Sequence, residues 1–438
     1  MNLPDTALPP CRARHGELRW DALVFFTSLL LYALTLHIGP GGRAQPGDAA
    51  KFQYIGLVLG VPHAPGYPLY VLSTWLWTRL PSLLSHATMV NLLSAFYTAA
   101  ALVVFRRALR ALGVSTVITL LFTAALMSAP RVWLRATEAG PGSLSVLLAC
   151  AMLWAVFHLA VTGSTAAYAA VLALTLIAAG HDTALLWWAP CVLIVATCWA
   201  PGAWRNRMTW LALAAGLLLG PGAHLYVYLR SWQTAPVLEY VGPRAPLARV
   251  IAHMLGAQFW PNYWHLGPRA MLAERVPLVL GDLTVQLHYA GAALAAPGLL
   301  WAWVRLRRPA VFLTLMLAAG ALPALHMFAP QPAAHAWLVV PAAACCAALG
   351  MQAICAYAGR LRGALLVLCA AWVLQHAAVS AQLVTRRAAD YHWRDLLLAM
   401  PSPSIMLTAD IYTTREVLAY YHWTDRFVRQ RVIGVRDA

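Results

Sequence analysis

The sequence predicts an all-α protein with about eleven transmembrane helices, and two observations support this prediction. Of the 438 residues, 61% are hydrophobic and only 11% are charged, whereas soluble globular proteins carry about 25% charged residues. The apolar residues also recur in runs of about 18–22 residues, which is the length that an α-helix needs to cross a bilayer. This composition excludes a water-soluble globular protein.

The expected membrane spans are the apolar runs between short polar breaks. They lie near residues 20–38, 87–105, 114–130, 143–162, 166–181, 183–200, 209–228, 283–304, 310–329, 336–357 and 364–382. No small-residue cleavage motif follows the first run, so we expect an uncleaved first helix. The eight cysteines lie almost wholly inside apolar runs without a C-x-x-C pair, which predicts packing residues rather than disulfides or a zinc site.

The arginines predict the topology, because cytoplasmic loops of membrane proteins carry an excess of basic residues. Three arginines precede the first run, and alternate loops are also basic except for the 163–165 turn. The residues concerned are Arg12, Arg14, Arg19, Arg106, Arg107, Arg110, Arg205, Arg207, Arg305, Arg307, Arg308, Arg360 and Arg362. We therefore expect a multi-pass protein of a bacterial inner membrane, with a cytoplasmic N-terminus and a periplasmic C-terminus.

This topology divides the chain into a transmembrane domain, residues 1–382, and a small extracytoplasmic segment, residues 383–438. Two long segments of the domain fall on the outer side, residues 39–86 and residues 229–282. Within the C-terminal segment, residues 404–409 form a strand-like run and residues 413–421 a helix-like run. The segment therefore predicts a small α/β appendage.

The charges point to chemistry on the outer face. The net charge is +16, but the basic residues stand at the ends of apolar runs and form no continuous patch, which argues against nucleic acid as a partner. A transporter is expected to keep ionisable groups at mid-membrane depth, where they mark the conducted path. After Asp21, the acids of the membrane half all fall at or beyond the outer ends of the runs: Asp48, Glu138, Asp182, Glu239, Glu274 and Asp282.

One outer segment carries a specific motif. It reads Gly47-Asp48-Ala49-Ala50-Lys51-Phe52 and then Leu59-Gly60-Val61-Pro62-His63-Ala64-Pro65-Gly66-Tyr67-Pro68-Leu69. It resembles the first outer loop of GT-C-type membrane glycosyltransferases, in the branch related to protein O-mannosyltransferases. Further similarity appears in residues 133–144, in Gly180-His181-Asp182-Thr183, and in Tyr226-x-Tyr228-x-Arg230 with the run that follows to His253 and Gly256.

Two positions depart from the pattern of that family. Lys51 replaces a glutamate that usually follows the aspartate by three residues, and Ala139-Gly140-Pro141-Gly142 replaces a signature of the Ala-Glu-Val-Tyr type. Lys51 would lie about one helical turn from Asp48, where its ammonium would stabilise the ionised carboxylate.

The resemblance implies an inverting transferase that moves a sugar, with mannose as the candidate, from a polyprenyl-phosphate donor to a hydroxyl of a protein or glycan acceptor outside the membrane. Such a transfer needs a carboxylate to take the acceptor proton and cations to stabilise the departing phosphate. We assign the first role to Asp48, whose alternative is a helix N-cap. No cofactor and no metal constellation is predicted, although a divalent metal near Asp48 or the His181-Asp182 pair remains an alternative.

The other candidates for substrate binding surround this loop in the expected topology. They are Lys51, His63, Tyr67, Glu138, His181, Asp182, Tyr228, Arg230 and His253. Several of them have a structural role as the alternative to substrate binding. His63 could be a structural turn histidine, Asp182 a helix cap, and His253 a packing residue of an amphipathic helix. For the phosphate, Arg131, Arg135, Arg244 and Arg249 are further outer-side candidates, against snorkelling to lipid headgroups.

Two other functions compete with the transferase. A flippase or transporter of lipid-linked sugars would share the helices and a basic cavity, but would need polar pairs along a route through the membrane. A non-catalytic binding or assembly protein is suggested by Lys51 and Gly140, which replace residues of the family motif.

Overall fold

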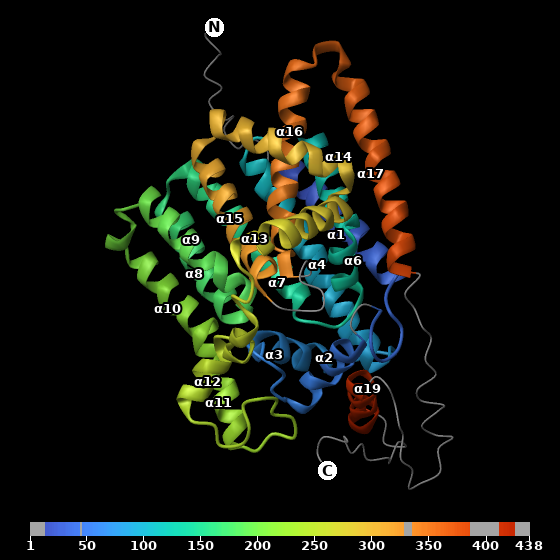
Figure 1. The fold of residues 1–438 in the computed structure, drawn as a ribbon, viewed down its shortest axis with the longest axis vertical. Coiled ribbons are helices and arrows are strands. Elements are labelled where there is room, and N and C mark those ends of the chain that lie inside the picture. The colour runs from blue at the N-terminus through green and yellow to red at the C-terminus, as the bar shows by residue number, and fades with distance from the viewer. Residues whose placement is uncertain (1–13, 44–45, 328–334, 386–410, 425–438) are drawn as a thin grey trace.

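The computed structural model describes residues 14–43, 46–327, 335–385 and 411–424. Within these ranges the chain folds into helices (Figure 1), and the isolated parallel bridge between Val61 and Leu238 is the β-type pairing found there. The predicted all-α class is confirmed for the part of the chain that the structure describes.

A helix occupies each of the eleven predicted apolar runs. In chain order these are α1 (Arg14–Leu34), α4 (His86–Ala111), α5 (Thr116–Ser128), α7 (Gly142–Thr162), α8 (Thr165–His181), α9 (Thr183–Trp199), α10 (Arg207–Leu219), α14 (Val276–Arg305), α15 (Arg307–His326), α16 (Val339–Tyr357) and α17 (Arg362–Thr385). The predicted domain boundary at residue 382 lies inside α17, and the division into two domains stays a prediction.

Fewer helices than eleven meet the length and composition expected of a membrane span. Seven do so among the described residues, or eight if α5 and α6 (Pro130–Thr137), which meet at a bend of 65°, form one broken span. Helices α8 and α9 have 17 residues each and are shorter than this criterion requires. The number of eleven spans therefore stays a prediction.

The centre of the bundle is packed with small residues. Helices α14 and α16 approach so closely that a Cβ atom at Gly298 would collide with the carbonyl oxygen of Cys346. Close backbone approach at small residues is how helices associate within a bilayer. Cys150, Cys345 and Cys346 are buried in this core as free thiols, which confirms their interpretation as packing residues.

The two ends of the bundle differ in character. At one end, the buried guanidinium of Arg106 at the end of α4 binds Asp21 and Glu17 near the start of α1, at 2.5 and 2.7 Å. The opposite end holds shorter helices (Figure 1): α2 (Pro46–Val58), α3 (Pro68–Trp77), α11 (Leu225–Trp232), α12 (Leu247–Met254) and α19 (Ile411–Thr424). The two predicted outer segments and the described part of the C-terminal segment thus meet at one end.

The C-terminal segment contains a helix where one was predicted. The helix-like run of residues 413–421 lies within α19, which packs against α2. The strand-like run of residues 404–409 lies outside the described residues, so the α/β character of the predicted appendage is not confirmed.

Candidate active site

Helix α2 presents the two charged residues of the first-loop motif on one face. Asp48 is the third residue of α2 and lies in its first turn, so it is not the N-cap that the alternative interpretation required. Lys51 follows three residues later, and the two side chains meet at 3.4 Å. The predicted pairing is therefore confirmed. The Lys51 side chain is only 2% exposed, whereas that of Asp48 is 30% exposed and accessible to a ligand.

The Lys51 ammonium lies where three other polar groups converge. It donates to Glu239 Oε2 at 3.0 Å and lies 3.4 Å from both Asp48 Oδ1 and His63 Nδ1. The backbone N–H of His63 donates to the same Glu239 oxygen at 2.7 Å. No group of three or more His, Cys, Asp and Glu side chains among the described residues is placed to hold a metal ion. In this cluster the positive charge comes from Lys51.

The second outer segment delivers Glu239 by pairing with the first. Val61 donates its N–H to Val237 at 2.8 Å and accepts from the N–H of Glu239 at 2.9 Å. This short parallel bridge fixes the backbone beside His63, so that the Glu239 side chain reaches Lys51 across the loop. Gly60 permits the approach, because a Cβ atom there would lie 2.7 Å from Ile55 Cδ1 and 3.0 Å from Val237 Cβ.

Tyr226 and two residues of the second outer segment, Arg230 and His253, hold the turn between α2 and His63. Tyr226 donates to the carbonyl oxygen of Gly60 at 3.0 Å, and Arg230 donates to that of Leu59 at 2.7 Å. Burial lowers the pKa of His253 to about 4, so its ring is neutral near pH 7, and its Nε2 lies 3.2 Å from the carbonyl oxygen of Pro62. A carbonyl accepts only, so this nitrogen is the donor.

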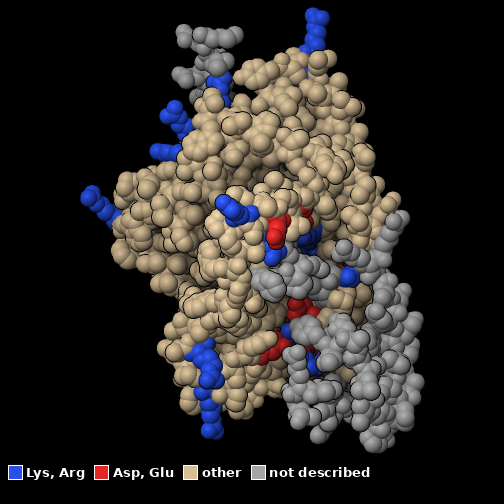
Figure 2. Space-filling view, in the orientation of Figure 1, with Lys and Arg blue, Asp and Glu red and all other residues tan. Residues whose placement is uncertain are grey.

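A polar cavity of about 830 Å³ opens beside this cluster. Figure 2 shows acidic and basic side chains gathered near the middle of one face, whereas the other basic side chains on that face stand at its edges. The cavity brings together six of the ten predicted site residues: Asp48, Lys51, His63, Tyr67, Glu138 and Asp182. The other four, His181, Tyr228, Arg230 and His253, are not among its lining residues.

These four residues instead support the site from outside. Arg230 binds backbone carbonyls at the end of α2, and His253 binds the turn at Pro62, which agrees with the packing alternative for His253. His181 is buried beneath Tyr67, with ring centroids 5.7 Å apart, and Tyr228 packs against Trp232. Sequence motifs locate such residues near a site, but do not distinguish a side chain that faces the ligand from one that holds the loop.

Two acids of the cavity wall also have structural bonds. Asp182 caps α9 by accepting from the N–H of Ala184 at 2.8 Å, as the alternative interpretation expected, and its second oxygen accepts from Ser145 at 2.5 Å. Glu138 accepts from the backbone N–H of Arg43 at 2.6 Å, at the entry to the first outer segment. Through these hydrogen bonds, both carboxylates hold the segments that form the wall of the cavity.

The cavity is also lined by a guanidinium that no described carboxylate pairs. Arg135, on α6, lies over the ring of Trp337 at 4.6 Å and makes no hydrogen bond or ion pair within the described ranges. Its neighbour Arg131 is bound to Asp282 at 2.5 Å. Gly142 leaves room for Arg135, because a Cβ atom at this position would overlap Nη1 of the guanidinium. The departure from the family signature at residue 142 therefore creates space for a cation.

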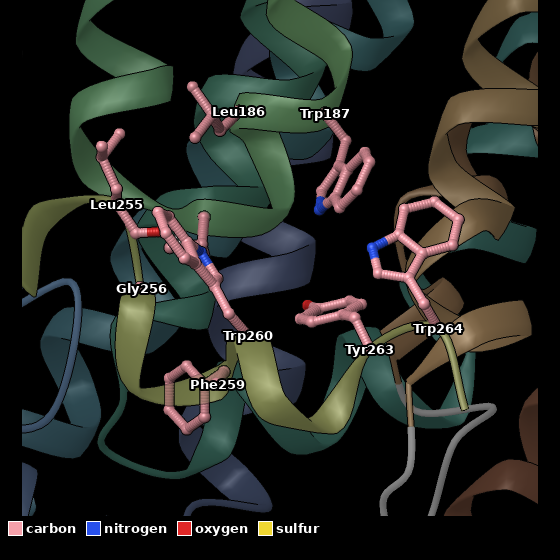
Figure 3. A pocket seen from close by; sticks show the side chains of 9 residues that line it. Leu186, Trp187, Leu255, Gly256, Phe259, Trp260, Tyr263 and Trp264 are labelled. Atoms are coloured by element: carbon pink, nitrogen blue, oxygen red, sulfur yellow. The ribbon is translucent and has the colours of Figure 1, made fainter. Parts of the chain in front are cut away.

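An aromatic pocket of about 430 Å³ adjoins the polar cavity. Figure 3 shows the rings of Trp187, Tyr263 and Trp264 around one side of its opening, with Leu186, Leu255 and Trp260 on the other. Thr183, Phe259 and Tyr263 line both the pocket and the cavity, so the two lie next to each other. An apolar pocket therefore lies beside a cavity lined by charged side chains.

Interactions across the cluster hold Glu239 in its ionised form. Burial by itself raises the pKa of this carboxyl, but the hydrogen bond from His63 and the charge of Lys51 outweigh it and bring the pKa to about 2. Glu239 is therefore a permanent counter-ion of Lys51 near neutral pH. From the sequence, Glu239 could be identified only as one of the acidic residues on the outer side. Nothing in the residues around Glu239 indicates a partner in another loop.

Comparisons with known proteins agree with this architecture. Residues 48–200 match the family model for the N-terminal domain of the protein O-mannosyl-transferase TMEM260. Among solved structures, the chain is similar to ArnT from Cupriavidus metallidurans bound to undecaprenyl phosphate, with 16% sequence identity and a TM-score of 0.53 over 94% of this chain and 70% of that one. No curated protein sequence matched. The chain therefore shares the fold of ArnT, and its residues 48–200 resemble the N-terminal domain of that O-mannosyl-transferase family.

The GT-C-like fold predicted from the first-loop motif is thus confirmed, together with the resemblance to O-mannosyltransferases. The matched family segment begins at Asp48 and also contains Lys51, Arg135 and Asp182. It does not include Glu239 or the C-terminal helix, which reach the cavity of this GT-C-like protein from outside that segment. The sequence predicted Arg135 only as one of several possible phosphate contacts. It did not predict that Trp337, His335 and Arg415 line the cavity.

Proposed function

We propose that this protein is a membrane glycosyltransferase that transfers a sugar from a polyprenyl-phosphate donor to an acceptor hydroxyl on the outer face of a bacterial inner membrane. The observation that carries the proposal is that an accessible carboxylate, Asp48, and a guanidinium without an ion pair among the described residues, Arg135, line the same cavity. Transfer with inversion requires a base and a group that receives the developing phosphate charge.

In this proposal Asp48 acts as the general base. Its carboxylate takes the proton of the acceptor hydroxyl while the hydroxyl oxygen forms a bond to the anomeric carbon of the sugar. The bond between that carbon and the donor phosphate oxygen breaks, and its electron pair leaves with the polyprenyl phosphate. Lys51 holds Asp48 in place at 3.4 Å, and Glu239 holds Lys51 at 3.0 Å.

Arg135 is the proposed contact for the donor phosphate. An arginine fork matches the geometry of phosphate oxygens, and its charge is not neutralised by a described ion pair. Trp337 packs against the guanidinium, and Arg135 still lines the cavity. Arg131 is a weaker candidate, because its guanidinium is already bound to Asp282.

The aromatic pocket is the proposed place for the first isoprene units of the donor. It is apolar, adjoins the charged cavity, and has Trp260 and Trp264 more than half exposed at its rim. Tryptophans are favoured at the membrane interface, where one side of the ring is apolar and the other meets headgroups. ArnT, whose fold this chain shares, was crystallised with undecaprenyl phosphate.

Mannose is the proposed sugar, and a protein or a glycan the proposed acceptor, on the strength of the family resemblance. The test is transfer in vitro by the purified protein from a panel of radiolabelled polyprenyl-phosphate sugars, with the Asp48→Asn variant as a control. Transfer from one donor that disappears in Asp48→Asn supports the proposal. A parent protein that binds a donor lipid but transfers from none would favour the non-catalytic or transport alternative.

A further inference from the structure

The C-terminal helix α19 packs directly on the helix that carries Asp48. Its apolar face enters a cluster with residues of α2, α3 and α4; the buried members from α19 are Val417, Leu418, Tyr420 and Tyr421. Tyr420 also accepts a hydrogen bond from the N–H of Ala87 at 3.2 Å. The helix is therefore held in place by burial of apolar surface, although more than 300 residues separate it from its partners in the sequence.

The polar edge of α19 carries two adjacent charged residues, of which Arg415 faces the cavity and Glu416 is buried. Arg415 lines the cavity, with its side chain 46% exposed, and donates to Glu416 Oε1 through two nitrogens at 2.7 and 3.1 Å. Glu416 is buried, and its second oxygen accepts from the hydroxyl of Tyr54 on α2 at 2.8 Å. Arg415 also lies 3.9 Å from Glu239 Oε1.

These contacts close a ring that begins and ends on α2. Asp48, Lys51 and Tyr54 follow one another at intervals of three residues, which places them along one face of the helix. Lys51 contacts Glu239, which lies beside Arg415, and the Arg415–Glu416 pair returns to Tyr54. The two oxygens of Glu239 are thus divided between its partners: Oε2 faces Lys51 and His63, and Oε1 faces Arg415.

We propose that α19 forms part of the active site and that Arg415 is a positioning residue, which acts through Glu239 on Lys51 and Asp48. A carboxylate that is only 17% exposed and lies between two cations is held in one orientation, because rotation would leave one cation without its partner. Arg415 approaches Oε1 of Glu239, while Lys51 binds the other oxygen, Oε2. The activity part of this inference rests on the proposed glycosyltransferase function.

The test uses the full-length protein and four variants. Arg415→Ala removes the cation, Arg415→Lys retains a charge, and Glu416→Gln weakens the clamp on Arg415. His422→Ala, at an exposed position of the same helix, is the matched control. If Arg415 positions the base, kcat falls by up to about 10²-fold in Arg415→Ala with little change in the KM for the donor, and Arg415→Lys restores part of it.

Amide hydrogen exchange of the same proteins supplies a readout that needs no substrate. Arg415→Ala should speed exchange in residues 46–63, which include α2 and the turn at His63, while Arg415→Lys and His422→Ala stay close to the parent. Parental exchange and parental kcat in Arg415→Ala would overturn the inference and leave the proposed function standing. If the parent transfers from no donor, the proposed function fails, and the exchange measurement still decides whether Arg415 holds this region.

Discussion

Lys51 and Glu239 form a 3.0 Å ion pair although 188 residues separate them in the sequence. Their side chains are 2% and 17% exposed, so the pair is shielded from solvent at the wall of the cavity. A buried ammonium is stable only when its charge is compensated, and here it is shared between Glu239 and the more exposed Asp48. The pair thereby connects the two outer segments at the point where the proposed base lies.

The first prediction concerns the base. Asp48→Asn keeps the shape of the side chain but removes the proton acceptor, so transfer should fall by roughly 10²–10⁴-fold. The melting temperature should change little, because the carboxyl group is partly exposed and the amide still accepts a hydrogen bond from Lys51. Transfer rates and thermal melting of the purified variant check this. An Asn variant that turns over like the parent would rule out Asp48 as the base.

The second prediction concerns Lys51 as the cation of the cluster. Lys51→Ala and the volume-matched Lys51→Met leave Asp48 and Glu239 without the charge between them, so we expect transfer to be lost in both. Transfer by the parent should survive chelators of divalent ions, since Lys51 supplies the positive charge at this point. Strict dependence of the parent on a divalent ion contradicts this prediction.

The third prediction uses the glycine beside Arg135. A methyl group at Gly142 overlaps the far end of the Arg135 side chain, which can move aside, so Gly142→Ala should fold normally but displace the guanidinium. If Arg135 binds the donor phosphate, the KM for the donor should rise about 10-fold, the scale of one charge-assisted hydrogen bond. Gly140→Ala is the matched control, because no atom lies within 4 Å of a Cβ at that position. Equal KM values for the two variants would remove Arg135 from the phosphate site.

The fourth prediction is a pH dependence of stability. The pKa of Glu239 is lowered from 4.5 to about 2 in the folded protein, so its ionised form contributes roughly 3 kcal/mol to stability above pH 5. That contribution is lost as the pH falls toward 2. The difference in melting temperature between the parent and Glu239→Gln should therefore shrink between pH 5 and pH 2. The same difference for Glu274→Gln, at an exposed position, should stay small throughout; a pH-independent effect of Glu239→Gln speaks against an ionised pair.

The fifth prediction concerns orientation in the membrane. The end that carries α2, α3 and α19 should face the periplasm, and the end where Arg106 binds Asp21 should face the cytoplasm. A C-terminal reporter that is active only in the cytoplasm should be silent, whereas the same reporter in the loop between α16 and α17, near residues 358–361, should be active. The reverse pattern would place the cavity on the cytoplasmic side.

The sequence alone determined the helical class, the positions of the eleven apolar helices and the first-loop motif with Asp48 and Lys51. These are local properties: hydrophobicity over about 20 residues sets a membrane helix, and a spacing of three sets one face of α2. Only the tertiary structure decided that Glu239 and Arg415 join this motif, and that Arg230 and His253 support the loop without lining the cavity. Such contacts depend on how segments far apart in the chain are brought together by packing of the bundle, and no local pattern of charge or hydrophobicity encodes which two of them will meet.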